Sequence, residues 1–280
     1  MKKTLLYYWY VHKQWNDLYD FHFDNLQAYK DVFDEEIFII SRDKTTEQEK
    51  IDRVENRIKE IFPNAQFEYY DNNPELRESL WFFNEVAAKL KQWPDNWYFF
   101  AHNKGVDTFY KTPDDCRRWI AAMYFMNLHD MEEIEKEMNS DETCVIGTYL
   151  IRNLRAWPWL KYRWHFSGTY WWFNPKKAHD IITKYKSVYP PNNRYFTEGF
   201  WGSVIPDEER YRKPSLLMYG ANHNQKFNWM NDELIQKIRE ILPQYQRLFV
   251  KKTPFVYNPG HNIVHRNKNM VRKKLRKYVL

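Results

Sequence analysis

The chain has 280 residues, enough for one large domain or two small ones, and it can bury a core without disulfides or structural metals. Hydrophobic residues make up 43% and charged residues 29%, values close to globular averages that exclude a wholly disordered chain. Seven of the 43 Lys and Arg residues lie in residues 263–280, and without them the basic count falls just below the 37 acidic residues, so the body of the chain lacks the positive excess of a general nucleic-acid-binding domain.

The first half of the chain alternates predicted strands with predicted helices. Short apolar and aromatic runs followed by polar residues predict strands at 4–11, 36–40, 66–70 and 97–101. Apolar residues at helical spacing predict helices at 15–32, 46–61 and 75–91, the second begun by a capping box of Thr46 and Glu49. This alternation is typical of an α/β fold with a mainly parallel sheet flanked by helices.

Polar residues occur where each predicted strand ends. The carboxyl ends of parallel strands meet at one edge of a sheet, and ligands bind beyond that edge. We therefore expect the residues that end these strands to face one site. They are Tyr10 to His12 at the end of the first strand, Ser41 to Asp43 at the end of the second, Asp71 to Asn73 after the third, and His102 to Gly105 after the fourth.

The second half of the chain changes character and becomes dense in Trp and Tyr. A long helix is predicted from Pro113 to Met138, because proline is favoured at the first position of a helix, and a short strand is predicted at 144–147. No repeat or clear linker divides the sequence. We expect one domain over residues 1–262, followed by a helical, basic C-terminal extension over residues 263–280.

Several widespread motifs are absent from the sequence. It contains no G-x-G-x-x-G, G-x-x-x-x-G-K-[ST], H-E-x-x-H or G-x-S-x-G, which disfavours dinucleotide oxidoreductases, P-loop NTPases, zincins and α/β-hydrolases. A strict Asp-x-Asp is also missing, and the two cysteines lack metal-finger spacing. No apolar run is long enough to span a membrane, so we expect a cytoplasmic protein.

The best candidate for chemistry is the segment His102–Gly105. It places an imidazole, an amide and a cation at the carboxyl end of a strand, and Gly105 allows a ligand to approach the backbone closely. These groups are suited to binding phosphate. The alternative interpretation is a polar turn in which the glycine serves an unusual backbone angle.

A second candidate consists of two aromatic segments in the second half. A carboxylate framed by aromatic rings can act as a general base, and flat rings can stack on sugar faces. The alternative is that the tryptophans are core residues and that Glu198 pairs with Arg194 one helical turn away. The candidate residues are His165, Ser167, Trp171, Trp172, Arg194 and Glu198.

Taken in order, these segments resemble a family of bacterial and viral glycosyltransferases. That family typically shows a His-x-Lys-Gly loop, then a Gly-x-Phe-Trp-Trp-like segment and an Arg…Glu-x-Trp-like segment, and it is associated with capsule, lipopolysaccharide or surface-glycan assembly. The resemblance covers roughly residues 4–205. It is carried by FFAHNKGV at 99–106, the aromatic helix after Pro113, CVIG at 144–147, HFSGTYWWFN at 165–174 and RYFTEGFW at 194–201.

The resemblance implies a GT-A-like, Rossmann-type fold that moves a sugar from a nucleotide-sugar donor to a glycan or lipid-linked glycan. A UDP-sugar is the first donor to test. Lys104, with His102 and Arg42, would neutralise the leaving diphosphate, and Glu198 would be the base of an inverting displacement. The nucleoside and phosphates would be held by Tyr10, His12, Arg42, Asp43, Asn73 and Asn103, and the sugar or acceptor by His165, Ser167, Arg194 and a wall of Trp171 and Trp172.

Metal dependence is left open by the sequence. Many GT-A enzymes hold Mn²⁺ or Mg²⁺ with an Asp-x-Asp after the fourth strand, where this chain has His102-Asn103-Lys104. Lys104 would then replace the metal as a point charge beside the diphosphate. If a divalent ion does bind, His102 or Asp107 is the candidate ligand.

The basic C-terminal extension offers a second kind of contact. Residues 270–280 place apolar residues on one helical side and basic residues around the rest, which predicts a membrane-surface helix. We expect the segment 266–280 to contact an anionic membrane there, close to a lipid-linked acceptor. The alternative is a solvated tail. Two other functions are kept as alternatives: a module that binds single-stranded nucleic acid through exposed aromatics, and a non-catalytic carbohydrate-binding protein on the same fold. We expect no nucleic-acid partner.

Overall fold

A seven-stranded sheet forms the centre of the computed structural model, which describes residues 1–12, 17–105, 113–141, 143–148, 150–152, 164–166, 168–185, 188–205, 214–216 and 240. The strand order is β3-β2-β1-β4-β8-β5-β9. Two further strands, β6 (Leu150–Arg152) and β7 (Trp164–Phe166), form a separate antiparallel pair. The strands of the large sheet are β1 (Lys3–Val11), β2 (Glu35–Arg42), β3 (Gln66–Asp71), β4 (Trp97–His102), β5 (Val145–Gly147), β8 (Trp171–Phe173) and β9 (Pro214–Leu216).

Most pairs of neighbouring strands in this sheet are parallel, as predicted. β1 pairs in parallel with both β2 and β4, β2 with β3, and β5 with β9, whereas β8 runs antiparallel to β4 and β5. The chain builds outward from β1 to β2 and β3, and then returns to place β4 on the other side of β1. The strand order therefore reverses between β1 and β4, which is where α/β sheets open a crevice for ligands.

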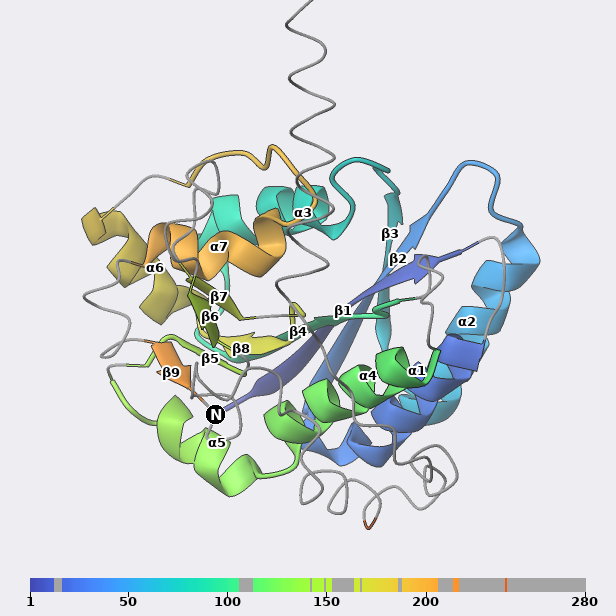
Figure 1. The fold of residues 1–280 in the computed structure, drawn as a ribbon, viewed down its shortest axis with the longest axis horizontal. Coiled ribbons are helices and arrows are strands. Elements are labelled where there is room, and N and C mark those ends of the chain that lie inside the picture. The colour runs from blue at the N-terminus through green and yellow to red at the C-terminus, as the bar shows by residue number, and fades with distance from the viewer. Residues whose placement is uncertain are drawn as a thin grey trace, which may run out of the picture.

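Helices cover both faces of the sheet and confirm the predicted α/β architecture (Figure 1). The sheet lies between two layers of helices, and successive side chains of each central strand point alternately toward one layer and the other. One face carries α1 (Asp17–Ala28), α2 (Gln48–Ile61), α4 (Pro113–Leu128) and α5 (Met131–Met138). The other carries α3 (Glu78–Trp81), which continues as π-helical Phe82–Val86 and 3₁₀-helical Ala87–Gln92, together with α6 (Pro175–Tyr185) and α7 (Phe196–Val204). A 3₁₀ turn at Lys30–Val32 follows α1.

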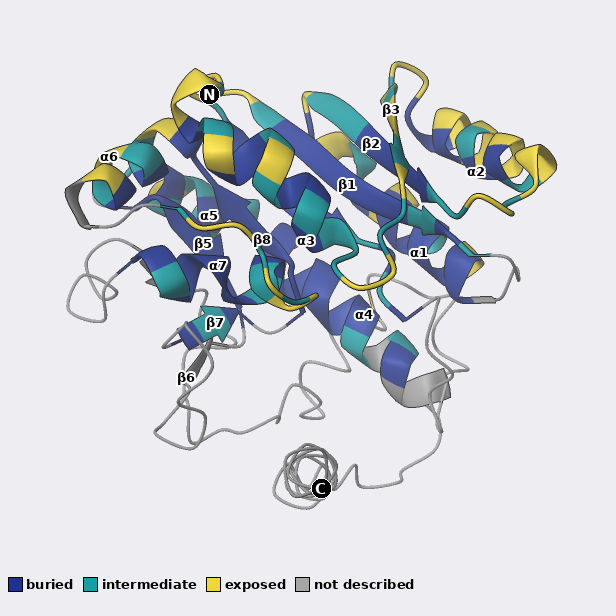
Figure 2. Ribbon diagram, turned by 90° about the horizontal axis from the view of Figure 1, so that it is seen from above, coloured by how far each residue is buried: buried dark blue, intermediate teal, exposed yellow. Residues whose placement is uncertain are grey.

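The central strands are buried on both faces, so the sheet supplies two hydrophobic cores. Along β1, Leu5, Tyr7 and Trp9 point toward the α1 layer, and Leu6 and Tyr8 point toward the α3 layer. Figure 2 shows these strands in dark blue between helices whose outer faces are exposed. Burial on both faces explains why β1 and β4 read as continuous apolar runs rather than as alternating patterns.

Three predicted helix boundaries differ from the structure. α2 begins at Gln48, and the Thr46 hydroxyl accepts a hydrogen bond from the Asp43 amide at 3.1 Å instead of capping the helix. The helix predicted from residue 75 begins at Glu78 and soon becomes irregular. The long helix predicted to reach Met138 is broken in two, because Asp130 caps the second half by accepting from the Glu133 amide.

α7 packs closely against β7, and a glycine makes this approach feasible. A methyl group at Gly202 would overlap the carbonyl oxygen of Trp164. The first turn of α7 carries Glu198, so this contact fixes the height of that carboxylate above the sheet. The predicted basic extension, residues 263–280, lies outside the described residues.

Candidate functional site

A pocket of about 240 Å³ opens at the carboxyl ends of β1, β2 and β4, beside the point where the strand order reverses. Nine of the residues that the sequence predicts at this site line it, together with six that it did not predict there. The predicted ones are Tyr10, Asp43, Asn72, His102, Asn103, Lys104, Gly105, Arg194 and Glu198; the others are Tyr8, Pro74, Arg77, Glu78, Thr169 and Tyr195.

The loop after β4 is held from below by side chains that bind its backbone. The Asn103 amide bridges β1, accepting from the Tyr10 amide at 2.9 Å and donating to the Tyr10 carbonyl at 2.8 Å. The Tyr170 hydroxyl donates to the His102 carbonyl at 2.6 Å. Gly105 follows with φ of 88°, a left-handed conformation that other residues rarely adopt. The loop is thus a built element rather than a freely variable turn.

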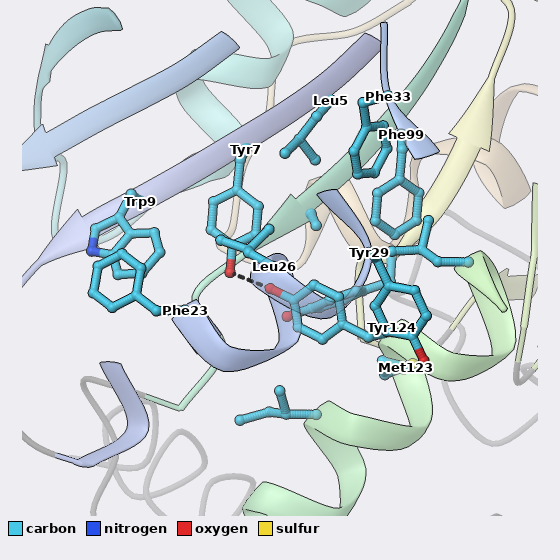
Figure 3. Close-up of a cluster of buried hydrophobic side chains, with 14 of the residues drawn as sticks. Leu5, Tyr7, Trp9, Phe23, Leu26, Tyr29, Phe33, Phe99, Met123 and Tyr124 are labelled. Carbon is cyan, nitrogen blue, oxygen red and sulfur yellow. Dashed lines mark hydrogen bonds between the residues drawn. The ribbon is translucent and has the colours of Figure 1, made fainter. Parts of the chain in front are cut away.

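A fully buried histidine completes this support from α1. His22 Nε2 lies 3.0 Å from the Lys104 carbonyl, which can only accept, so Nε2 carries the proton and Nδ1 accepts from a tyrosine hydroxyl. Tyr7 and Tyr124 lie 3.1 and 3.3 Å from Nδ1 and are bonded to each other at 2.9 Å (Figure 3). Burial lowers the pKa of His22 to about 3, opposed by the bond to Lys104 and reinforced by His102.

Acid should therefore destabilise the fold through His22. The unfolded chain binds a proton at this residue below about pH 6.5, whereas the folded chain does not until about pH 3. The free energy of unfolding keeps its full value above about pH 6.5 and falls as the pH is lowered from there toward about 3. At pH 5 the loss is about 2 kcal/mol. Urea unfolding at pH 7 and pH 5 should show a smaller loss for His22→Gln than for the unmodified protein. His179→Gln, at a more exposed histidine, is the control, and an equal loss in all three proteins would contradict the assignment.

Lys104, in the loop directly after β4, places a positive charge in the pocket. Its ammonium lies 4.0 Å from the centre of the Trp119 ring, a cation–π contact that restrains the side chain. Across the pocket, Glu78 Oε1 lies 3.6 Å from His102 Nδ1, and each of the two side chains is 14% exposed. Burial tends to raise the pKa of Glu78, but the neighbouring His102 and Lys104 outweigh it and lower the pKa below its ordinary value. Glu78 is therefore ionised.

A second carboxylate lies at the end of the pocket formed by β2 and β3. Asp43 accepts from the Tyr10 hydroxyl at 2.5 Å and from the Asn72 amide at 2.8 Å, while Thr46 holds its backbone. An acidic side chain after the second strand of a Rossmann-type sheet is suited to the hydroxyls of a ribose. The predicted neighbour Asn73 instead caps the following turn, accepting from the Leu76 amide at 2.9 Å.

The third carboxylate, Glu198, comes from the first turn of α7. Its Oε1 accepts from the Gly168 amide at 2.9 Å and lies 3.9 Å from His165 Nε2. Burial lowers the pKa of His165, although Glu198 acts to raise it, so the imidazole is neutral at pH 7. The two groups beside Glu198, a backbone amide and a neutral imidazole, therefore position this carboxylate without carrying a charge. The alternative prediction of a Glu198–Arg194 pair is not seen, because the Arg194 guanidinium lies 5.0 Å from the centre of the Tyr195 ring.

Two residues of the pocket wall have strained backbones. Among the described residues, Arg77 (φ 52°) and Thr169 (φ 62°) are the non-glycine residues with positive φ. Arg77 has ψ of −135°, a combination that glycine adopts readily and other residues do not. Such strain costs on the order of 1–3 kcal/mol per residue and clusters at functional sites.

Several predicted residues lie away from the pocket. Trp171 and Trp172 are completely buried in β8, where Trp172 Nε1 donates to the Asn127 carbonyl, so they cannot form the predicted sugar wall. His12 directly follows β1 and Arg42 ends β2, but neither is among the described residues that line the pocket. Ser167 and Asp107 lie outside the described residues.

The sequence reasoning missed residues that depend on the turn after β3. Arg77 and Glu78 were expected inside a regular helix, and a break at Arg77 brings both into the pocket. The Asp71-Asn72-Asn73-Pro74 turn was the available clue, since it ends a strand at the same edge. Tyr8 and Thr169 gave no such clue, because Tyr8 lies within the buried strand β1 and Thr169 is a buried residue just before β8.

Within the described residues, no group of three His, Cys, Asp or Glu side chains is arranged to hold a metal ion, and the carboxylate that lies near His102 there is that of Glu78. The described part of the chain has no helix with the length and apolar character needed to cross a bilayer.

Comparison with known proteins yields one weak structural similarity and no match in sequence. No family model matches the chain, and no curated protein matches it. Among solved structures, the chain is similar to that titled "Crystal structure of 4-diphosphocytidyl-2C-methyl-D-erythritol synthase" at 12% identity and a TM-score of 0.41, over 86% of this chain and 98% of that one. A similarity at this level carries no argument about function.

Proposed function

We propose that the protein is a glycosyltransferase that takes a sugar from a nucleotide-sugar donor and passes it to a glycan or lipid-linked glycan, as in capsule or lipopolysaccharide assembly. The proposal rests chiefly on one observation. Lys104 and Glu198, separated by almost a hundred residues and predicted to be the phosphate ligand and the base, line one pocket at the reversal point of the sheet. The sequence resemblance supports the same assignment.

The strand order suggests how a donor would lie. Along the sheet edge from β3 to β8, the pocket residues occur in the order Asn72, Asp43, Tyr10, the His102–Gly105 loop, and Thr169 with Glu198 beside it. We assign the nucleoside to the Asp43 end and the diphosphate to the loop. The sugar then lies toward Glu198, where an acceptor hydroxyl can reach it.

The chemistry follows from this placement. In an inverting transfer, the acceptor oxygen forms a bond to the anomeric carbon as the bond from that carbon to the diphosphate breaks. Glu198 takes the proton of the acceptor hydroxyl, and Lys104, assisted by His102, stabilises the negative charge that develops on the leaving diphosphate. The step is written without Mn²⁺ or Mg²⁺ because the Lys104 ammonium supplies positive charge beside the diphosphate. The basic segment 266–280 would bring the enzyme to a lipid-linked acceptor on an anionic membrane surface.

A module that binds single-stranded nucleic acid is less well supported. On this sequence, such a module would require its tryptophans to lie exposed on a basic face, where bases stack on them. Of the tryptophans that the structure describes, none is exposed, and Trp93 and Trp119 are the ones that are half-buried. A non-catalytic carbohydrate-binding protein would bind the same ligands without turnover.

A thermal-shift panel tests the proposal directly. UDP-, GDP-, dTDP- and CMP-sugars are each added to the full chain with Mn²⁺ or with EDTA, because a ligand at about 100 Kd stabilises a protein by roughly 2.7 kcal/mol. We expect one nucleotide family to raise the melting temperature, UDP-sugars first. Release of nucleoside diphosphate then separates an enzyme from a binding protein. No shift with any nucleotide, together with salt-sensitive RNA binding, would overturn the proposal.

A further inference from the structure

An arginine and a tyrosine form an exposed pair at the mouth of the pocket, directly before α7. Tyr195 is 48% exposed, and the Arg194 guanidinium lies 5.0 Å from the centre of its ring. Of the large hydrophobic side chains that are exposed in the described residues, namely Met1, Tyr69, Tyr189 and Tyr195, Tyr195 alone lines the pocket. An exposed ring that is stacked by a cation and faces a polar pocket is a surface suited to a ligand.

This exposed pair is held by a buried anchor. The Ser79 hydroxyl donates to the Arg194 carbonyl at 3.0 Å and accepts from the amide and the hydroxyl of Thr197 at 3.2 and 3.1 Å. On the other side, the Asn193 side chain accepts from the Tyr195 amide at 2.9 Å. The backbone of the pair is therefore fixed before a ligand arrives, which lowers the entropic cost of binding.

The charge of Arg194 has no counterpart in the pocket. Asp43 is bound by Tyr10 and Asn72, Glu78 faces His102, and Glu198 is bound by the Gly168 amide. Within the part of the chain that the structure describes, Arg194 makes no ion pair, and its guanidinium contacts an aromatic ring. A planar guanidinium binds a carboxylate or phosphate through two parallel hydrogen bonds.

We infer that Arg194 and Tyr195 form the acceptor subsite, and that the acceptor carries a carboxylate or phosphate next to the sugar that reacts. The inference rests on the proposed function. The pair lies one helical turn before Glu198, so an acceptor that gives its proton to Glu198 passes over Tyr195. Its ring stacks on the acceptor sugar, and Arg194 binds the anionic group. The diphosphate of the donor binds separately, at Lys104.

Glycan binding by the full chain tests this assignment. The probe is an array of neutral, uronic-acid-containing and phosphorylated oligosaccharides, with the nucleoside diphosphate identified by the thermal-shift panel present throughout. We expect at least tenfold tighter binding of anionic than of neutral glycans, and loss of that preference in Arg194→Ala, since hydrogen bonds to charged groups are worth about tenfold or more. The uronate and phosphate arms show which anionic group is used.

Matched variants separate the two side chains. Arg194→Lys should recover only part of the preference, because lysine lacks the planar fork. Tyr195→Ala should weaken neutral and anionic glycans by a similar factor, whereas Tyr189→Ala, an exposed tyrosine outside the pocket, should change neither.

Three results would overturn the inference: equal binding of neutral and anionic glycans, no binding of any anionic glycan, or an Arg194→Ala variant that loses nucleotide affinity and keeps its glycan preference. Failure of the proposed function is distinguishable from these, because it would already appear as the absence of any nucleotide-induced thermal shift.

Discussion

Replacing Glu198 with glutamine is expected to lower kcat about 10²- to 10⁴-fold, the usual contribution of a general base, while the nucleotide sugar still binds. The amide oxygen of glutamine can still accept the hydrogen bond from Gly168, so the loop before β8 keeps its support. It cannot take the proton of the acceptor hydroxyl. Steady-state rates of nucleoside diphosphate release and the donor-induced thermal shift, measured on the same preparations, check both halves of the prediction.

The control for this substitution is Glu132→Gln, because Glu132 is an exposed carboxylate on α5, on the opposite face of the sheet. It should leave both measurements unchanged. A Glu198→Gln enzyme with normal kcat would assign the base to another residue. A loss of donor binding without a change in kcat would instead make Glu198 a binding residue.

The second large effect is expected at Lys104. Lys104→Met should lower kcat/KM about 10²- to 10³-fold, because it removes the positive charge that faces the leaving diphosphate. Methionine is apolar and flexible enough to remain against the Trp119 ring, so the fold should not change. Kinetics at a series of donor concentrations would show whether the loss falls on kcat, as expected for charge that develops during the reaction.

Two further variants sharpen this result. Lys104→Arg keeps the charge and should retain part of the activity, although the guanidinium is larger and planar. Lys91→Met removes an exposed lysine outside the pocket and should have no effect. Full activity of Lys104→Met, in Mn²⁺ and in EDTA alike, would contradict the role given to this residue.

The sheet and one half of the pocket were predictable from the sequence because they depend on local patterns. Buried parallel strands read as apolar runs, and each ends in polar residues, so the sequence alone predicts that Asp43 and Lys104 lie at one edge of the sheet. Glu198 was predicted as a site residue from the aromatic residues around it in the sequence and from the resemblance to glycosyltransferases.

The other half of the pocket depends on backbone conformations that have no local pattern. Glu78 enters the site only because Arg77 adopts a glycine-like conformation, and nothing in the sequence favours an arginine there. Trp171 and Trp172 failed as a sugar wall for a different reason. Consecutive aromatic residues suit both a buried strand and a ligand surface, and only the pairing of β8 between β4 and β5 decides between the two.

The strained backbones of Arg77 and Thr169 shape the pocket wall at a cost to the stability of the fold. Glycine at either position would release the strain, a gain that its greater freedom in the unfolded chain offsets only in part. Laboratory selection for heat resistance alone should therefore enrich glycine at these two positions, and the pocket wall would become more flexible. A selection that also demands turnover should retain the arginine and the threonine.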